Sequence, residues 1–342
     1  MVKLNKNTTD YKGVCVVTEQ RDGKLQGVSL ELLGKGKELA RDLSCELTAI
    51  LVGYEVKELA NELASYGADK VILVEDEKLK DYLTEPYTVA TFEAIKSIKP
   101  EIVLFGATSI GRVLAPRVAS RIGAGLTADC TKLEIDKENH LLLMTRPAFG
   151  GNLMATITSE EVRPQMSTVR PGVMRKSEPD LSRKAEIINL DVNFTEEDFS
   201  VELLESKVDT KKKINIEDAE ILVSVGRGIG SKENIEEAYE LAEVLGATVS
   251  GSRAVVDSGW LDKDRQVGQT GKTVRPNLYI ALGISGAIQH LAGMEESDLI
   301  IAVNKNHDAP IFEVADIGIV GDVHKVIPQL IKLIKEKKAK KA

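Results

Sequence analysis

The chain has 342 residues, of which 43% are hydrophobic, so it is long enough for two domains of ordinary size. Its net charge of -8 argues against a general attraction to nucleic acid or to an anionic membrane surface. The sequence has no long apolar run of membrane-spanning length, and its polar first ten residues lack the apolar core of a signal peptide, so we expect a cytoplasmic location.

The first half of the chain alternates strand and helix patterns. Strands are predicted at 14–18, 47–52, 70–74 and 102–105, and helices at 30–43, 56–66, 87–98 and 109–122. Gly67, Pro100 and Gly123 follow three of these helices, as is typical of helix ends. This order predicts a mostly parallel sheet with helices on both faces.

The pattern changes in the middle of the chain. Three further strands, at 130–135, 140–146 and 154–158, are joined by short polar or glycine-rich turns, and we expect them to be antiparallel additions to the same sheet. The segment 195–218 is charged and lacks a clear apolar face. We therefore expect a linker here, with a hinge at 207–214 between a first domain, 1–206, and a second domain, 215–342.

The strand–helix order starts again in the second half. Strands are predicted at 220–225, 248–250, 278–282, 299–303 and 317–320, and helices at 234–245 and 323–335. The basic tail, 335–342, is expected to fray. The predicted fold class is α/β, with two domains that each contain a mostly parallel sheet flanked by helices, the second domain being Rossmann-like.

Metal and thiol chemistry have little support in this chain. Cys15, Cys45 and Cys130 are odd in number, far apart and form no C-x-x-C motif. This argues against a disulfide framework, and also against an iron–sulfur or zinc site built from this chain alone. We expect buried structural thiols and no metal.

A glycine-rich turn, Gly226 to Gly230, follows the first strand of the second half. Its position suits phosphate binding, although the third glycine comes one residue early for G-x-G-x-x-G, and many tight turns between strands and helices are glycine-rich. Arg227 favours the functional interpretation, because a guanidinium in such a turn can bind phosphate bidentately.

Two more segments carry polar side chains beyond strand ends. Ser252 and Arg253 follow the short strand at 248–250, where a surface turn with a solvated arginine is the alternative. Residues 266–272 resemble part of a P-loop but have glutamine in place of its first glycine. The two glycines that bracket Gln269 and Thr270 instead indicate backbone pressed close to a flat ligand.

The most informative segment is 276–304. An apolar strand enters a turn of small residues, a short helix carries Gln289 and His290, and a second strand ends at Asn304. Asp322 follows another strand and is also placed to cap the last helix. Because the carboxyl ends of parallel strands meet at one edge of a sheet, we expect one site there. Its hydroxyls, amides, arginine and single histidine suit a large polar cofactor better than hydrolysis or metal chemistry.

These motifs, in this order, closely resemble those of the electron transfer flavoprotein alpha-subunit family. The matching strings are Gly-Arg-Gly, Gly-Ser-Arg, Gln-Val-Gly-Gln-Thr-Gly, Leu-Tyr-Ile-Ala-Leu-Gly-Ile-Ser-Gly-Ala-Ile-Gln-His-Leu-Ala-Gly-Met, Ala-Val-Asn and Gly-Asp. The resemblance implies an FAD held mainly by the second domain and a heterodimer with a beta subunit that carries AMP or, in electron-bifurcating members, a second FAD. It implies electrons carried one at a time between a flavin dehydrogenase, such as an acyl-CoA dehydrogenase, and another redox partner, in some members within a bifurcating complex with NADH and ferredoxin.

The resemblance also implies roles for individual positions. Arg227 would lie near the pyrophosphate or adenosine, Asn304 and Asp322 at the adenosine end, and 285–289 along the pyrophosphate and ribityl chain. Ser252, Arg253 and 266–270 would lie beside the isoalloxazine ring, with Thr270 on N5 and His290 near O2. The full predicted cofactor-binding set is Arg227, Ser252, Arg253, Gln266, Val267, Gly268, Gln269, Thr270, Gly283, Ile284, Ser285, Gly286, Ala287, Ile288, Gln289, His290, Asn304 and Asp322.

Reduction places negative charge on the N1–C2=O2 region of a flavin, so we expect Arg253, Thr270 and His290 to tune it with charge and hydrogen-bond donors. Two other functions stay open from the sequence. One is a nucleotide-binding regulatory or sensor module of the same fold without a redox role. The other is a pyridine-nucleotide oxidoreductase that uses the 226–230 turn, against which stand the glycine spacing and the serines, Ser250 and Ser252, at the end of the next strand.

Overall fold

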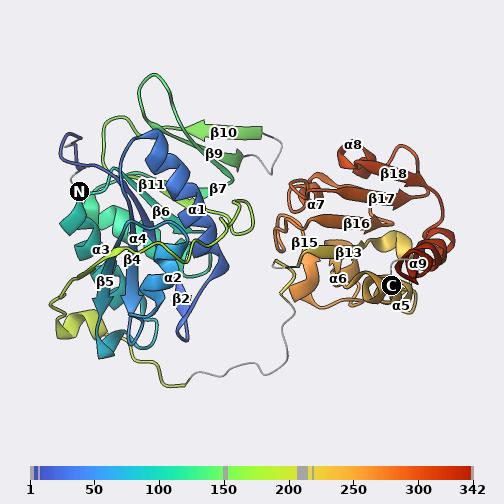
Figure 1. Ribbon diagram of the computed structural model, residues 1–342, viewed down its shortest axis with the longest axis horizontal. Helices are drawn as coiled ribbons and strands as arrows, with labels where there is room; N and C mark the ends of the chain where they lie inside the picture. Colours follow the sequence, from blue (N-terminus) through green and yellow to red (C-terminus); the bar gives the residue numbers. More distant parts are fainter. Residues whose placement is uncertain (1–3, 7, 149–152, 206–214, 218, 340–342) are drawn as a thin grey trace. The chain divides into compact units, whose positions relative to one another are not determined.

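The computed structural model describes residues 4–6, 8–148, 153–205, 215–217 and 219–339. They form two compact units, one containing the described residues up to 205 and the other those from 215 onward (Figure 1). The predicted hinge at 207–214 lies outside the described residues, so it stays a prediction.

The first unit is built on a seven-stranded sheet in which every ladder is parallel. Its spatial order is β12 (Glu186–Asn189), β5 (Lys70–Glu75), β4 (Leu47–Gly53), β1 (Val14–Val17), β6 (Ile102–Gly106), β11 (Gln165–Val169) and β7 (Leu126–Cys130). A parallel sheet of this kind needs cover on both faces. The central strand β1 is accordingly apolar on both: Val14 and Val16 belong to one core and Cys15 and Val17 to the other.

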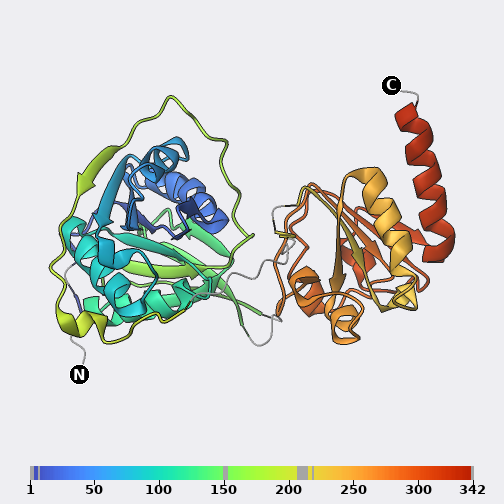
Figure 2. The ribbon, with the colours of Figure 1, turned by 90° about the horizontal axis from the view of Figure 1, so that it is seen from below.

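Helices cover both faces of this sheet, as the alternating pattern predicted (Figure 2). α1 (Gly27–Asp42) and α2 (Leu59–Ser65) pack on one face, and α3 (Thr84–Ile98) and α4 (Gly111–Ile122) on the other. A small hairpin, β2 (Gln20–Arg21) and β3 (Lys24–Leu25), follows β1. Short 3₁₀ helices occur at η1 (Glu77–Leu79) and η3 (Glu196–Phe199).

The expectation for the middle strands was partly wrong. β8 (Lys132–Ile135), β9 (Leu142–Ala148) and β10 (Leu153–Ile157) are antiparallel, but they form a separate three-stranded sheet. Leu133, Leu142 and Met144 pack onto one face of the large sheet, so the small sheet covers a core instead of extending an edge. In the large sheet, β11 lies between β6 and β7. The sequence did not predict this strand, because its buried Gln, Ser and Thr residues interrupt the apolar pattern.

The second unit is a six-stranded parallel sheet. Its spatial order is β15 (Gln266–Val267), β14 (Thr248–Ser252), β13 (Ile221–Val225), β16 (Leu278–Leu282), β17 (Ile300–Asn304) and β18 (Ile317–Val320). Numbered along the chain, this is 3-2-1-4-5-6, the order of the Rossmann fold. The order reverses between β13 and β16, and ligands of such sheets bind at this switch point.

Two helices, α5 (Ile235–Leu245) and α9 (Val323–Ala339), pack on one face of the second sheet (Figure 2). The other face is covered by loops with α7 (Ile288–Leu291) and α8 (Ile311–Val314). α6 (Arg253–Asp257) directly follows β14, and η4 (Arg227–Ile229) and η5 (Lys263–Arg265) complete the unit. The fraying expected from residue 335 is wrong as far as Ala339, and the Lys338 ammonium there donates to the Val244 carbonyl oxygen of α5.

Candidate cofactor site

Three glycines meet at the switch point of the second sheet. The Gly226 N–H donates to the Leu282 carbonyl at 2.8 Å, and the Gly228 N–H to the Gly283 carbonyl at 3.0 Å. A Cβ atom at Gly226 would overlap the Gly283 carbonyl oxygen, and one at Gly283 would lie 2.8 Å from the Gly228 backbone. Only glycine fits these three positions. The resulting surface of bare backbone allows the close approach that a pyrophosphate requires.

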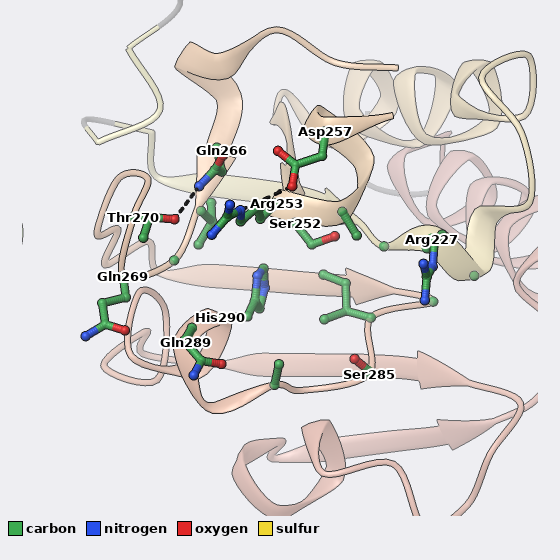
Figure 3. A pocket seen from close by; sticks show the side chains of 18 of the residues that line it. Arg227, Ser252, Arg253, Asp257, Gln266, Gln269, Thr270, Ser285, Gln289 and His290 are labelled. Carbon is green, nitrogen blue, oxygen red and sulfur yellow. Dashed lines mark hydrogen bonds and ion pairs between the residues drawn. The ribbon is translucent and has the colours of Figure 1, made fainter. Parts of the chain in front are cut away.

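A cavity of about 700 Å³ opens at this edge of the sheet (Figure 3). It brings together fifteen of the predicted residues, from five segments of the chain. They are Arg227, Ser252, Arg253, Gln266, Val267, Gly268, Gln269, Thr270, Gly283, Ile284, Ser285, Ala287, Gln289, His290 and Asn304. Arg227 and Ser285 lie toward one end. Gln269 and Thr270 lie toward the other, with His290 between the two ends.

Three of the predicted residues do not line this cavity. Gly286 lies against the backbone of Ile311, where its lack of a Cβ atom allows the close packing. Ile288 is 52% exposed. Asp322 accepts a hydrogen bond from the His324 N–H at 3.1 Å and pairs with Lys305, so it caps the start of α9, the alternative that the sequence had left open.

The structure adds a carboxylate that the sequence reasoning did not include. Asp257 lines the cavity, and its Oδ2 lies 3.1 Å from the Arg253 Nε. The pair spans one turn of α6, a spacing at which oppositely charged side chains meet on a helix. Both side chains are mostly exposed, so the attraction is weak, but Asp257 partly offsets the positive charge of Arg253.

The loop after β15 packs its own backbone against the turn of α7. The Gln269 N–H donates to the Gln289 carbonyl at 2.6 Å, and a Cβ atom at Gly268, where φ is +136°, would lie 2.8 Å from that same oxygen. The buried Gln266 amide donates to the Thr270 hydroxyl at 3.0 Å. The first of the two bracketing glycines therefore serves chain packing, which in turn fixes Thr270 at the rim of the cavity.

His290 is the one buried titratable side chain among the described cavity residues, at 7% exposure. Its Nε2 lies 3.0 Å from the Tyr279 hydroxyl, and its Nδ1 forms no hydrogen bond of standard geometry with any described residue. Burial lowers the pKa of His290 to about 4, a shift that the backbone carbonyl of Val267 opposes. The imidazole is therefore neutral at pH 7 and supplies no positive charge, contrary to one part of the expectation for this residue.

Positive charge at the described cavity comes from two arginines. Arg227 forms no ion pair with any described residue and lies exposed in the glycine turn, so it is free to meet an anion. Both polar atoms of the Asn304 side chain form hydrogen bonds with the backbone. Its Nδ2 donates to the Ile284 carbonyl at 2.8 Å, and its Oδ1 accepts from the Asn306 N–H at 2.9 Å. Asn304 thus holds the turn that carries Ser285.

Metal and thiol chemistry find little support in the part of the chain that the structure describes. It contains no group of three or more His, Cys, Asp or Glu side chains arranged to hold a metal ion. Burial raises the pKa of the Cys15 and Cys130 thiols far above neutral, so both stay protonated and unreactive. No described helix is long and apolar enough to cross a lipid bilayer.

Comparison with known proteins decides the family. Residues 14–195 match the electron transfer flavoprotein domain, and residues 215–295 match the electron transfer flavoprotein FAD-binding domain. The chain belongs to the electron transfer flavoprotein alpha-subunit family. The FAD-binding domain covers the glycine turn, the loop after β15 and the helix that carries His290, so the family's FAD site falls on the unit that contains the cavity.

Curated relatives are similar over almost the whole chain. An electron transfer flavoprotein subunit alpha from Thermoanaerobacterium thermosaccharolyticum is 55% identical over 96% of this chain and 99% of its own. The acryloyl-CoA reductase electron transfer subunit beta of Anaerotignum propionicum is 48% identical over 96% and 97%. The lactate dehydrogenase (NAD(+),ferredoxin) subunit LctC of Acetobacterium woodii is 42% identical over 95% and 77%.

The donor set of the cavity fits FAD. The bare backbone at the three glycines suits a pyrophosphate, and Arg227 stands beside it. Farther along the cavity, the Arg253 guanidinium and the His290 Nδ1, which forms no hydrogen bond of standard geometry, suit the electron-rich carbonyl edge of a flavin ring.

Proposed function

We propose that the cavity of the second unit holds the FAD with its pyrophosphate at the three glycines and its flavin ring toward Arg253, Thr270 and His290. The proposal is supported by the separation of these groups along the cavity, with Arg227 and Ser285 toward one end (Figure 3). The bound FAD would supply the redox chemistry. The chain itself binds it, orients it and sets the charge around it.

The residues around the ring would act by electrostatics. The positive charge of the Arg253 guanidinium would attract the negative charge that reduction adds. The Thr270 hydroxyl, held by Gln266, would reach the flavin N5. Ser252, at the end of β14, would lie beside the ring.

We further propose that the chain pairs with a beta subunit and passes electrons one at a time between a flavin dehydrogenase and another redox partner. The relatives include an acryloyl-CoA reductase subunit and a lactate dehydrogenase (NAD(+),ferredoxin) subunit, and their names support a partner among flavin dehydrogenases. An acyl-CoA dehydrogenase is the expected one. A cytoplasmic location stays part of this proposal.

A bifurcating complex is the second candidate, and the LctC relative favours it, because its name includes both NAD(+) and ferredoxin. The two candidates differ in the beta subunit. A simple carrier would have AMP there, and a bifurcating protein would have a second FAD.

The observation that carries the proposal is the match of the FAD-binding domain to the unit with the glycine-lined cavity. The test is to co-purify the chain with its beta subunit and to count flavin and AMP per heterodimer. One flavin with AMP supports the simple carrier, and two flavins support bifurcation. A heterodimer without flavin absorbance would contradict the electron-carrier function and favour a regulatory nucleotide-binding module.

A further inference from the structure

A second aromatic ring lies behind His290 in the core of the second unit. Tyr279 belongs to β16, has no exposed surface, and places its hydroxyl 3.0 Å from the His290 Nε2. The two ring centroids are 6.2 Å apart and the ring planes are inclined by 58°. The contact therefore joins the central strand of the sheet to α7, the short helix at the cavity.

The burial of Tyr279 fixes the direction of this hydrogen bond. Full burial raises the pKa of its phenol far above neutral, so the O–H keeps its proton. A buried hydroxyl that donates to nothing is costly. The Ser224 hydroxyl lies near enough to oppose the pKa shift of Tyr279 but forms no hydrogen bond of standard geometry. Nε2 is therefore the acceptor of the phenol proton.

The tautomer of His290 follows from that direction. A neutral imidazole carries one N–H, and a nitrogen that accepts a hydrogen bond cannot be the one that holds it. The proton of His290 then sits on Nδ1. This nitrogen is buried, and its side chain lines the cavity. The Val267 carbonyl lies near enough to oppose the pKa shift of His290, but Nδ1 forms no hydrogen bond of standard geometry with any described residue. A buried N–H without a well-aligned acceptor is open to one that a ligand supplies.

We propose that Tyr279 is a positioning residue of the cofactor site, which fixes His290 as the neutral Nδ1–H tautomer so that it presents a hydrogen-bond donor, and no charge, to an acceptor on the ligand. This inference rests on the proposed function, in which that acceptor is the pyrimidine edge of the flavin. Two residues then have different roles at the flavin. Arg253 supplies a positive charge, and His290 supplies a neutral hydrogen-bond donor that does not change across physiological pH. A ligand with a donor at the same place would be rejected.

The full chain, labelled with ¹⁵N-histidine and freed of cofactor, provides the first test, because it contains only four histidines. Their nitrogen shifts report protonation state and tautomer, and His290→Gln assigns the signal. At pH 7 we expect one neutral histidine with its proton on Nδ1. A proton on Nε2 or on both nitrogens would overturn the proposal.

Tyr279→Phe provides the second test, with Tyr239→Phe as the matched control. Tyr239 lies in α5 of the same unit and is 38% exposed, with the Arg265 guanidinium over its ring. Loss of the phenol donor should lower the ratio of Nδ1–H to Nε2–H in His290 about tenfold. The control should leave it unchanged. An unchanged ratio in Tyr279→Phe sinks the proposal, and if that variant does not fold, the wild-type tautomer decides.

Added FAD separates this inference from the proposed function. If the wild-type chain binds FAD, the Nδ1–H signal should move on binding, and Tyr279→Phe should lower the flavin potential while Tyr239→Phe does not. If no FAD binds, the proposed function fails, whereas the tautomer of His290 is still measured. If FAD binds and the Nδ1–H signal does not move, the donor role is wrong.

Discussion

The two parallel sheets of this chain reverse their strand order in the same way, yet among the described residues only the second has a large cavity at the point of reversal. In the first unit β1 lies between β4 and β6, and in the second β13 lies between β14 and β16. The cavity at the carboxyl edge of the first switch point has a volume of about 30 Å³, against about 700 Å³ at the second. The same topology therefore gives a filled crevice in one unit and a cofactor-sized one in the other.

The chain after the first strand makes the difference. After β13 comes the glycine turn, in which three of the five residues, Gly226, Gly228 and Gly230, have no side chain. After β1 comes Glu19, followed by the β2–β3 hairpin. The Glu19 carboxylate accepts a hydrogen bond from the Thr108 hydroxyl at 2.5 Å and pairs with Arg21 at 3.1 Å. The negative charge of this carboxylate repels a phosphate group. The cofactor site therefore depends on the turn after the first strand and not on the strand order, which the two sheets share at this point.

The largest effect is expected when a side chain fills the switch point of the second sheet. Gly283→Ala would place a Cβ 2.8 Å from the Gly228 backbone at a φ of +64°. Backbone cannot move aside as a side chain can, so we expect bound flavin to be lost, measured by absorbance per chain.

Gly106→Ala is the matched control, because Gly106 ends β6 as Gly283 follows β16. The atoms nearest to its Cβ would belong to the Val28 side chain, whose two methyl groups would lie at 2.8 and 2.9 Å. We expect a modest loss of stability and full flavin content. Full flavin content in Gly283→Ala would refute the role of the switch point.

The buried histidine gives the second unit a pH dependence, whereas His140, the one histidine of the first unit, is exposed. The His290 pKa of about 4 lies below the unfolded value of about 6.5. Between these two pH values the unfolded chain therefore binds more protons than the folded chain. The contribution of neutral His290 to the free energy of unfolding is fully present above pH 6.5 and is lost as the pH falls toward 4. The loss should be roughly 3 kcal/mol.

The measurement is chemical unfolding of the cofactor-free chain at pH 4.5 and 7, for wild type and for His290→Gln. Carboxylates elsewhere contribute to both proteins, so the difference between their pH slopes isolates His290. Equal slopes would show that the imidazole is not buried in its neutral form.

Much of this fold was predictable because strand and helix periods are local. The second unit was predicted strand by strand, except for the two-residue β15. The small antiparallel sheet was misplaced, because a strand pattern says which face is apolar and not which sheet it joins. β11 was missed, because it buries polar residues that tertiary contacts hold: the Gln165 side-chain oxygen accepts from the Leu142 N–H, and the Thr168 hydroxyl accepts from the Asp129 N–H.

The candidate site was predictable from motifs but its charges were not. Fifteen predicted residues share one cavity, since strand ends must meet at one edge. The proposed tautomer of His290 depends on a tyrosine eleven positions earlier, and the partner of Arg253 depends on a helix only five residues long. Neither follows from composition at the site, because both depend on which atoms fold next to each other.

A smaller effect is expected when the negative charge of Glu19 is removed from the crevice of the first unit. Glu19→Gln should weaken the hydrogen bond with the Thr108 hydroxyl and cost the first unit about 1–2 kcal/mol. Flavin content should not change. Glu46→Gln, at an exposed pair with Lys70, is the control and should have almost no effect on unfolding. Loss of flavin in Glu19→Gln would mean that the first crevice also serves the cofactor.

The smallest effect should come from the exposed ion pair of the second unit. Arg253→Gln removes the charge that faces the flavin and should lower its one-electron potential, whereas Asp257→Asn removes the opposing charge and should raise it. Both side chains are largely solvated, so shifts on the order of 50 mV are expected. Electrochemical titration measures them, with Glu19→Gln as the variant that should leave the potential unchanged. Two shifts of the same sign would show that these side chains act by changing the shape of the cavity, because charge alone requires opposite signs.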